Sequence, residues 1–178
     1  MKKKYEMRCV TEIMDPRALA DILEYADVLQ IGARNMQNFS LLNEVGGCGK
    51  PILLKRGFAS TLEEFMLAAE YLAVRGSRSI TLCERGIRAS QPHVRNMIDI
   101  AAIPLLKVET DLPIIVDLSH SLGRTDIVCE VARGVMAAGA DGIMVEVIKE
   151  PSKAASDAKQ QLDFGEYSQL LNALKIRD

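Results

Sequence analysis

Short apolar runs alternate with stretches of helical periodicity along the whole chain, and this alternation strongly limits the folds open to it. Each run is apolar almost throughout and too short to be a helix, which is typical of strands in a parallel sheet covered by helices on both faces. The pattern predicts six βα units in a single α/β domain, residues 1–178. The expected strands are residues 8–11, 28–31, 51–55, 79–83, 113–117 and 142–146.

The intervening helices carry start and stop signals. Asp15 before Pro16 fits an N-cap followed by proline at the first helical position. Thr61 and Glu64 have the spacing of a capping box, and Gly76 follows as a stop signal. Three apolar stripes are interpreted as core: Leu19, Ile22, Leu23 and Ala26; Leu62, Phe65, Met66, Ala69 and Leu72; and Ile127, Val128, Val131, Ala132, Val135 and Met136.

Six units are too few for a closed barrel. A TIM (β/α)8 barrel has eight strands and about 250 residues. The periodicity by itself therefore leaves two alternatives, a barrel that lacks two units or an open sheet.

Composition excludes several classes of function. A formal charge of -2 and a pI near 5.8 argue against nucleic-acid binding, and the only basic run is residues 1–4. No apolar run is long enough to span a membrane. The cysteines are scattered without a C-x-x-C pair or a secretory signal, which favours a reduced cytoplasmic protein. They are Cys9, Cys48, Cys83 and Cys129.

Residues able to bind a phosphate, a carboxylate or a metal follow each expected strand. The carboxyl-terminal edge of a parallel barrel is where active sites form. The residues at this edge are Glu12, Gly32-Ala33-Arg34-Asn35, Lys55-Arg56-Gly57-Phe58, Glu84-Arg85-Gly86, Asp117-Leu118-Ser119-His120-Ser121 and Glu146, and Ser156-Asp157-Ala158-Lys159-Gln160 comes after them.

These motifs, in this order, resemble 3-deoxy-7-phosphoheptulonate (DAHP) synthases of the class that groups with 3-deoxy-octulosonate 8-phosphate synthases. The resemblance covers about residues 5–174. It implies an aldolase-type TIM barrel that condenses phosphoenolpyruvate with erythrose 4-phosphate, using a divalent metal, at the start of the shikimate pathway to aromatic amino acids. Against that family pattern the chain corresponds to strands 3 to 8, so the expected fold is an incomplete barrel of about six βα units.

The resemblance implies a substrate site. Ala33, Arg34, Lys55 and Arg85 match residues that bind phosphoenolpyruvate, and Glu12 matches an acid near the reacting enol. The chemistry agrees, because a small substrate with a phosphate and a carboxylate needs several converging cations, and arginine clamps oxyanions in a bidentate way. A lone arginine is more often a surface ion pair. A charge placed directly after a buried strand is costly without a ligand, which favours the binding interpretation.

Two further arginines are ambiguous. Arg56 and Arg88 lie next to motif positions, and each fits either a second phosphate or a neighbouring carboxylate.

The resemblance also implies a metal site at His120, Glu146 and Asp157. One nitrogen and two carboxylates suit Mn, Fe, Co or Zn. A lone histidine is more often structural, and His93, in a polar stretch, is interpreted that way. The implied mechanism is aldol-like: the metal polarises the aldehyde and the enol carbon attacks. His120 and Glu12 are the other expected catalytic groups beside Lys55, which would move a proton to the developing alkoxide.

Several features depart from the family pattern. The first two βα units are absent, and with them a metal-ligand cysteine in a Gly-Pro-Cys motif and a Lys-Pro-Arg-Thr-Ser motif that binds both substrates. Cys9 is interpreted as a buried free thiol. Leu118 replaces a proline, and Leu122 and Ala158 replace glycines, so the loops near the metal are expected to change shape.

The absent units leave open a fragment of a normal synthase, one half of a split enzyme, a homologue that binds phosphoenolpyruvate or metal without turnover, or a regulatory subunit. Unpaired sheet edges predict a homo-oligomer or completion by another chain. Erythrose 4-phosphate is favoured over arabinose 5-phosphate by the Lys-Arg-Gly and Glu-Arg-Gly motifs.

Overall fold

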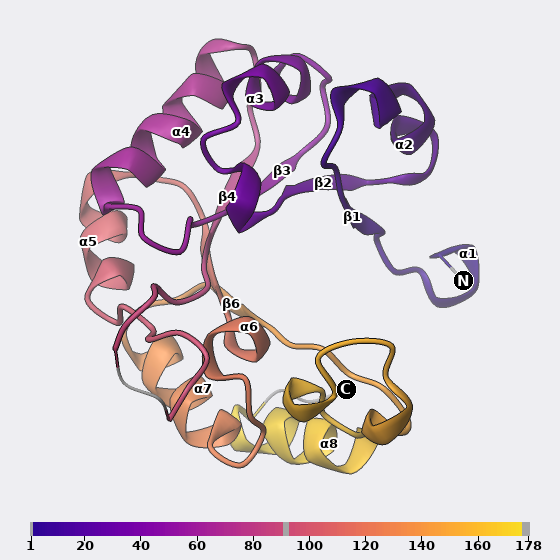
Figure 1. Cartoon of the computed structure of the whole chain (residues 1–178), viewed down its shortest axis with the longest axis vertical. Helices are drawn as coiled ribbons and strands as arrows, with labels where there is room; N and C mark the ends of the chain where they lie inside the picture. The colour runs from indigo at the N-terminus through magenta and orange to yellow at the C-terminus, as the bar shows by residue number, and fades with distance from the viewer. Residues whose placement is uncertain (1, 91–92, 176–178) are drawn as a thin grey trace. The chain divides into compact units, whose positions relative to one another are not determined.

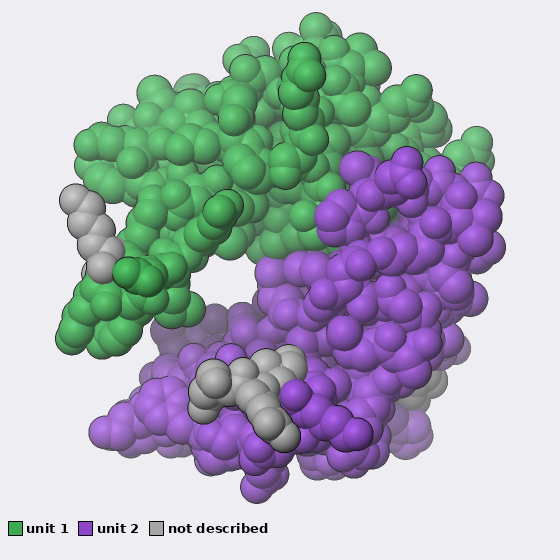
Figure 2. Space-filling model, turned by 180° about the vertical axis from the view of Figure 1, so that it is seen from behind, with its two compact units in different colours: residues 1–83 green, residues 84–178 purple. Residues whose placement is uncertain are grey.

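A computed structural model describes residues 2–90 and 93–175 (Figure 1). The chain divides into two compact units, Met1–Cys83 and Glu84–Asp178, which Figure 2 colours separately. The prediction of a single domain stays a prediction.

The first unit contains parallel strands that pair in chain order. They are β1 (Val10–Glu12), β2 (Val28–Ile31), β3 (Ile52–Lys55) and β4 (Ile80–Glu84), of which Glu84 belongs to the second unit. Every residue of β3 is buried, as its apolar sequence predicts. In β1, by contrast, Val10 and Glu12 are exposed, and the strand begins two residues later than expected. The prediction of a uniformly buried strand is wrong here, because β1 pairs with β2 and with no other strand among the described residues of this unit.

Helices precede and connect these strands. They are α1 (Lys2–Tyr5), the 3-10 turn η1 (Pro16–Ala18), α2 (Leu19–Tyr25), η2 (Ala33–Asn35), α3 (Phe39–Gly46) and α4 (Leu62–Val74). The predicted capping box of α4 is confirmed, since the Thr61 and Glu64 side chains each accept the other residue's backbone N–H. Asp15 caps as predicted, but Pro16 starts η1 and the α-helix begins only at Leu19.

The second unit has two paired parallel strands, β5 (Ile114–Asp117) and β6 (Gly142–Met144). The other elements are α5 (Ala102–Glu109), α6 (Leu118–Leu122), α7 (Val128–Ala137), η3 (Pro151–Lys153), η4 (Ala158–Gln160) and α8 (Phe164–Ala173). Asp141, which precedes β6, links β5 and α5: its carboxylate accepts hydrogen bonds from the backbone N–H of Ile114 and from the Lys107 ammonium. The hydrogen bond from Lys107, followed by the one from Ile114, holds the pKa of Asp141 below its ordinary value.

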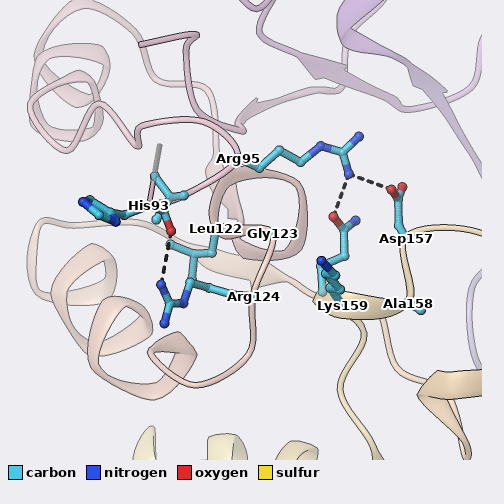
Figure 3. A pocket seen from close by; sticks show the side chains of 10 residues that line it. His93, Arg95, Leu122, Gly123, Arg124, Asp157, Ala158 and Lys159 are labelled. Atoms are coloured by element: carbon cyan, nitrogen blue, oxygen red, sulfur yellow. Dashed lines mark hydrogen bonds and ion pairs between the residues drawn. The ribbon is translucent and has the colours of Figure 1, made fainter. Parts of the chain in front are cut away.

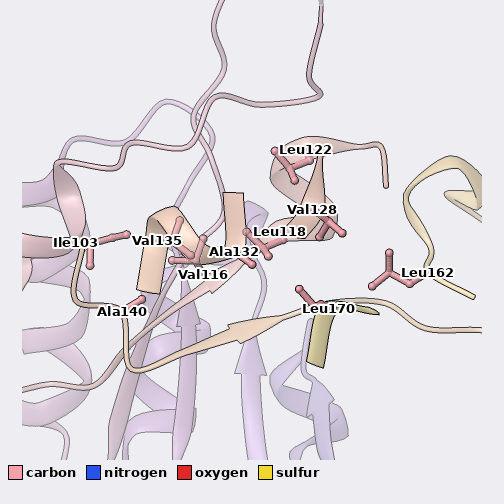
Figure 4. Close-up of a cluster of buried hydrophobic side chains, with 10 residues drawn as sticks. All are labelled: Ile103, Val116, Leu118, Leu122, Val128, Ala132, Val135, Ala140, Leu162 and Leu170. Atoms are coloured by element: carbon pink, nitrogen blue, oxygen red, sulfur yellow. The ribbon is translucent and has the colours of Figure 1, made fainter. Parts of the chain in front are cut away.

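Buried aliphatic side chains fix α6 in the second unit. Leu118 and Leu122 of α6 join Val116 of β5 in one apolar cluster (Figure 4). The helix α7 contributes Val128, Ala132 and Val135, which confirms most of its predicted stripe, whereas Met136 is 38% exposed. Because α6 is anchored at both ends, its middle residue, His120, is held in place at the end of β5.

The alternation of parallel strands and helices confirms the predicted α/β class with six βα units. Within each unit the strands follow chain order, as in a TIM-type barrel. Among the described residues, no helix combines the length and apolarity needed to cross a membrane.

Candidate active site

Glu12 and Gly32 are in close contact at the ends of β1 and β2. A Cβ atom at Gly32 would lie 2.0 Å from Glu12 Oε1, so a side chain there would displace the carboxylate from its present position. The other oxygen, Glu12 Oε2, accepts a hydrogen bond of 3.1 Å from Gln30 Nε2. The acid is therefore oriented beside the backbone that leads into Ala33.

Arg34 is exposed, and its guanidinium lies 5.7 Å from the centre of the Phe58 ring. Ala33 and Arg34 form η2 directly after β2, whereas Phe58 follows β3. The cation–π contact therefore holds Arg34, which follows β2, against Phe58, which follows β3. This arrangement leaves the guanidinium reachable from solvent.

Lys55 ends β3 and is only 5% exposed. Arg56 is buried too, with its backbone N–H bonded to Cys83 O and its Nε donating to Ser60 O. Gly57 fits against Ser60, whose Oγ would lie 2.3 Å from an added Cβ. The Lys-Arg-Gly motif is thus a tight turn that points Arg56 into its own loop, which favours a structural role for Arg56.

In the second unit, Arg85 is 3% exposed and sits between Glu84 and Gly86. The Glu84 carboxylate accepts the Gly86 N–H at 2.7 Å. Gly86 has φ +83°, and a Cβ there would come within 2.7 Å of Asn96 Cβ. Glycine is therefore required for both the turn and the contact with the following loop.

His120 is oriented by Asp117 at the start of α6. Asp117 is fully buried, and its carboxylate accepts the His120 backbone N–H and contacts His120 Nδ1 at 2.9 Å. A carboxylate on one ring nitrogen fixes the ring and leaves the other nitrogen to coordinate a metal. That other nitrogen, Nε2, lies 3.7 Å from Glu146 Oε1.

The donor pair His120 and Glu146 fits a divalent metal. Two donors that are each about 2.1 Å from one ion lie no more than about 4.2 Å apart, and the observed separation is within this limit. Both side chains are partly exposed, so an ion can reach them. The Ser119 hydroxyl accepts the Glu146 N–H at 2.9 Å and so ties the strand end to α6.

Asp157 is not brought together with that pair. Its carboxylate is bound to Arg95 Nη1 at 2.9 Å (Figure 3). In the part of the chain that the structure describes, no cluster of three or more His, Cys, Asp or Glu side chains is gathered for a metal ion. Of the three predicted metal ligands, His120 and Glu146 therefore lie next to each other, whereas Asp157 pairs with Arg95.

The left-handed backbone positions of these loops do not fall on the residues that replace glycines. Leu122 is helical, and the following Gly123 takes φ +68°. Asp157 takes φ +53°, directly before Ala158. Cys9, expected to be buried, is half-buried as a free thiol, with its N–H donating to Asp27.

Arg95 and Asn96 were not singled out from the sequence, and Gln160 was given no role beyond its place in a motif, although these polar residues connect the site. Asn96 Nδ2 donates to His120 O, and Arg95 N–H donates to Leu122 O. Gln160, only 3% exposed, accepts from Arg95 and donates to Glu146. A buried glutamine in a polar run of sequence gives no local signal, because its burial comes from contacts with distant residues.

Comparisons with known proteins identify the relatives of this chain. The chain is 52% identical over 172 residues to the phospho-2-dehydro-3-deoxyheptonate aldolase of Thermotoga maritima, covering 97% of this chain and 51% of the relative. It is 30% identical to a 2-dehydro-3-deoxyphosphooctonate aldolase of Coxiella burnetii, of which it covers 66%. Its structure matches a truncated form of the Thermotoga maritima 3-deoxy-D-arabino-heptulosonate 7-phosphate synthase with a TM-score of 0.95, covering 97% of this chain and 66% of that one.

The chain thus spans between half and two thirds of the length of these relatives. The structural match confirms the predicted incomplete TIM-type barrel. The model of the DAHP synthetase I family matches residues 1–177, nearly the entire sequence. The chain therefore belongs to the DAHP synthetase I family.

Proposed function

We propose that this chain takes part in the metal-dependent condensation of phosphoenolpyruvate with erythrose 4-phosphate, the DAHP synthase reaction at the start of the shikimate pathway. The observation that carries the proposal is the oriented pair of His120 and Glu146, with Nε2 and Oε1 3.7 Å apart, in a chain of this family. A metal ion bound by such donors can act as a Lewis acid and activate an aldehyde toward attack.

We propose that Ala33, Arg34, Lys55 and Arg85 bind phosphoenolpyruvate. In the first unit, Arg34 is exposed at the end of β2 and Lys55 is buried at the end of β3. The backbone N–H of Ala33 follows Gly32, and Glu12 lies against that glycine. In the second unit, Arg85 is buried directly after β4. These groups supply the point charge, the guanidinium forks and the backbone donor that a phosphate and a carboxylate require.

We propose that His120, Glu146 and Asp157 hold Mn, Fe, Co or Zn. The bound ion would supply Lewis-acid polarisation of the aldehyde oxygen. Asp117 orients the His120 ring, and Ser119 fixes the backbone of Glu146. Lys55 is proposed to hold or move a proton beside the developing alkoxide.

The second candidate function is synthesis of 3-deoxy-octulosonate 8-phosphate from arabinose 5-phosphate. The 30% identical Coxiella burnetii relative supports it, but the 52% identity to the Thermotoga maritima heptonate aldolase favours the seven-carbon product. We expect mass spectrometry to find a seven-carbon product when the chain receives both aldose phosphates with phosphoenolpyruvate and Mn²⁺. An eight-carbon product as the main species would replace the first candidate by the second.

We propose that the chain works as a homo-oligomer or is completed by another chain. A groove of about 500 Å³ lies along β6 in the second unit, lined by Ile143, Met144, Val145, Tyr167 and Leu171 among others. All residues of β6 are only half-buried, although its sequence is that of a core strand. A half-buried apolar strand favours association with other apolar segments, which would cover its exposed surface.

We expect the purified 19.6 kDa chain to sediment as a species of at least twice that mass. Met144→Lys puts a charge in the groove and should shift the distribution toward the monomer. Val108→Lys is the matched control, because Val108 is 81% exposed and does not line the groove. A wild-type chain that sediments only as a monomer would contradict self-association and leave completion by a different chain.

Localisation in the cytoplasm is proposed from the four free cysteines. Recovery of the protein in an oxidised, extracytoplasmic fraction would contradict it.

A further inference from the structure

A polar network in the second unit holds the third metal-ligand candidate away from the other two. Arg95 Nη1 contacts Asp157 Oδ1 at 2.9 Å and donates to Gln160 Oε1 at 2.6 Å. Figure 3 shows Arg95 reaching across to Asp157 on the loop that continues into Lys159. The opposite end of the same amide, Gln160 Nε2, donates to Glu146 Oε2 at 2.9 Å.

Further contacts hold the members of this network, among them the backbone hydrogen bond from Gln160 N–H to Asp157 O at 3.0 Å. Gln160 is 3% exposed, so its amide has little freedom to find other partners. The Arg95 backbone donates to Leu122 O, and its Cβ would lie 2.7 Å from a Cβ built on Gly123. Asp157 has a left-handed backbone, φ +53°, directly before η4. The backbone hydrogen bond therefore holds Arg95 next to Leu122, the last residue of α6.

We infer that Arg95 is a positioning residue that competes with the metal for Asp157. This inference rests on the proposed metal site at His120, Glu146 and Asp157. The Arg95 guanidinium binds the Asp157 carboxylate while His120 and Glu146 already lie within coordination range of each other. Coordination by Asp157 then requires its release from Arg95, so the arginine lowers the affinity for the metal. Gln160 keeps Glu146 in place when Asp157 leaves, because its bond to Glu146 does not involve Asp157.

The competition predicts that Arg95→Met tightens Mn²⁺ binding. Both partners of the ion pair are 36% exposed, and such a pair contributes up to about 1 kcal/mol, so the expected change in Kd is roughly fivefold. Methionine keeps most of the apolar stem, and Arg95→Gln is a second variant with the same expectation. Kd is measured on the full chain by the electron paramagnetic resonance signal of free Mn²⁺, which does not depend on activity.

Arg124→Met is the matched control. Arg124 lines the same pocket, but it binds Asp126 and His93 O instead of Asp157. We expect the Mn²⁺ Kd of Arg124→Met to stay within about twofold of wild type. The comparison distinguishes the effect of releasing Asp157 from that of losing a positive charge near the site. Asp157→Asn should weaken binding, and in that background Arg95→Met should no longer tighten it.

The outcomes distinguish this inference from the proposed function. Mn²⁺ bound by wild type, with Kd unchanged or weakened by Arg95→Met, would overturn the competition and leave the metal site standing. Equal tightening by Arg95→Met and Arg124→Met would overturn it as well. A wild-type chain that binds no Mn²⁺ would overturn both. In that case the free energies of unfolding of wild type, Arg95→Met, Asp157→Asn and the double variant, measured with chelator, would give the energy of the ion pair alone.

Discussion

Replacement of His120 by alanine is expected to weaken Mn²⁺ binding by more than about 100-fold. Loss of a residue that only orients a metal ligand typically costs 10–100-fold, and His120 is proposed to be a ligand itself. Its Nε2 lies 3.7 Å from Glu146 Oε1, and Asp117 at Nδ1 fixes the ring in that orientation. The measurement is titration of the chain with Mn²⁺ by calorimetry, with circular dichroism to verify folding.

His93 supplies the matched control, because it is the other histidine of the chain and is exposed in a loop. His93→Ala is expected to leave the Mn²⁺ Kd unchanged. Equal losses in the two variants would mean that the histidines bind Mn²⁺ non-specifically. A folded His120→Ala protein with wild-type affinity would contradict the proposed site.

Replacement of Lys55 by methionine is expected to weaken phosphoenolpyruvate binding roughly 10- to 150-fold. A hydrogen bond to a charged group contributes about 1.5–3 kcal/mol, which gives this range. Lys55 is 5% exposed at the end of β3, so its ammonium is largely withdrawn from water, where a hydrogen bond to an anion is stronger. Calorimetric titration with phosphoenolpyruvate measures the change, and urea unfolding checks that the variant is stable.

Lys50→Met is the control for that experiment, because Lys50 precedes the same strand at its opposite end. Phosphoenolpyruvate affinity should be unaffected there. If Lys55→Met also leaves a normal pH dependence of condensation, Lys55 does not move the proton. A Kd for phosphoenolpyruvate that is the same in both variants and wild type would remove Lys55 from the substrate site.

Most of the strands were predictable from sequence because local signals determine them. Uniformly apolar runs placed β2, β3 and β5 within a residue of their observed bounds, and the Thr61–Glu64 spacing placed the start of α4. The motif around His120 placed that side chain directly after β5, where the structure has it.

The position of the Asp157 carboxylate, the burial of Gln160 and the exposure of β1 depend on contacts between residues far apart in the sequence, which local patterns do not reveal. Asp157 and Glu146 are near in sequence, yet Arg95, more than fifty residues earlier, decides where the Asp157 carboxylate points. The buried Gln160 side chain is bonded to Arg95 and Glu146, which lie 65 and 14 residues away in the sequence. Exposure of β1 likewise follows from its having one neighbour in its unit, which its residue types do not reveal.

The most direct test of the proposed condensation is the loss of phosphoenolpyruvate ultraviolet absorbance when the chain is mixed with erythrose 4-phosphate and Mn²⁺. Two mixtures are compared. The first contains this chain alone, and the second also contains a polypeptide with the barrel segment of the Thermotoga maritima relative that this chain does not match. We expect a loss of absorbance that a chelator stops and that His120→Ala prevents. No loss in either mixture, with both polypeptides folded and Mn²⁺ bound, would contradict it.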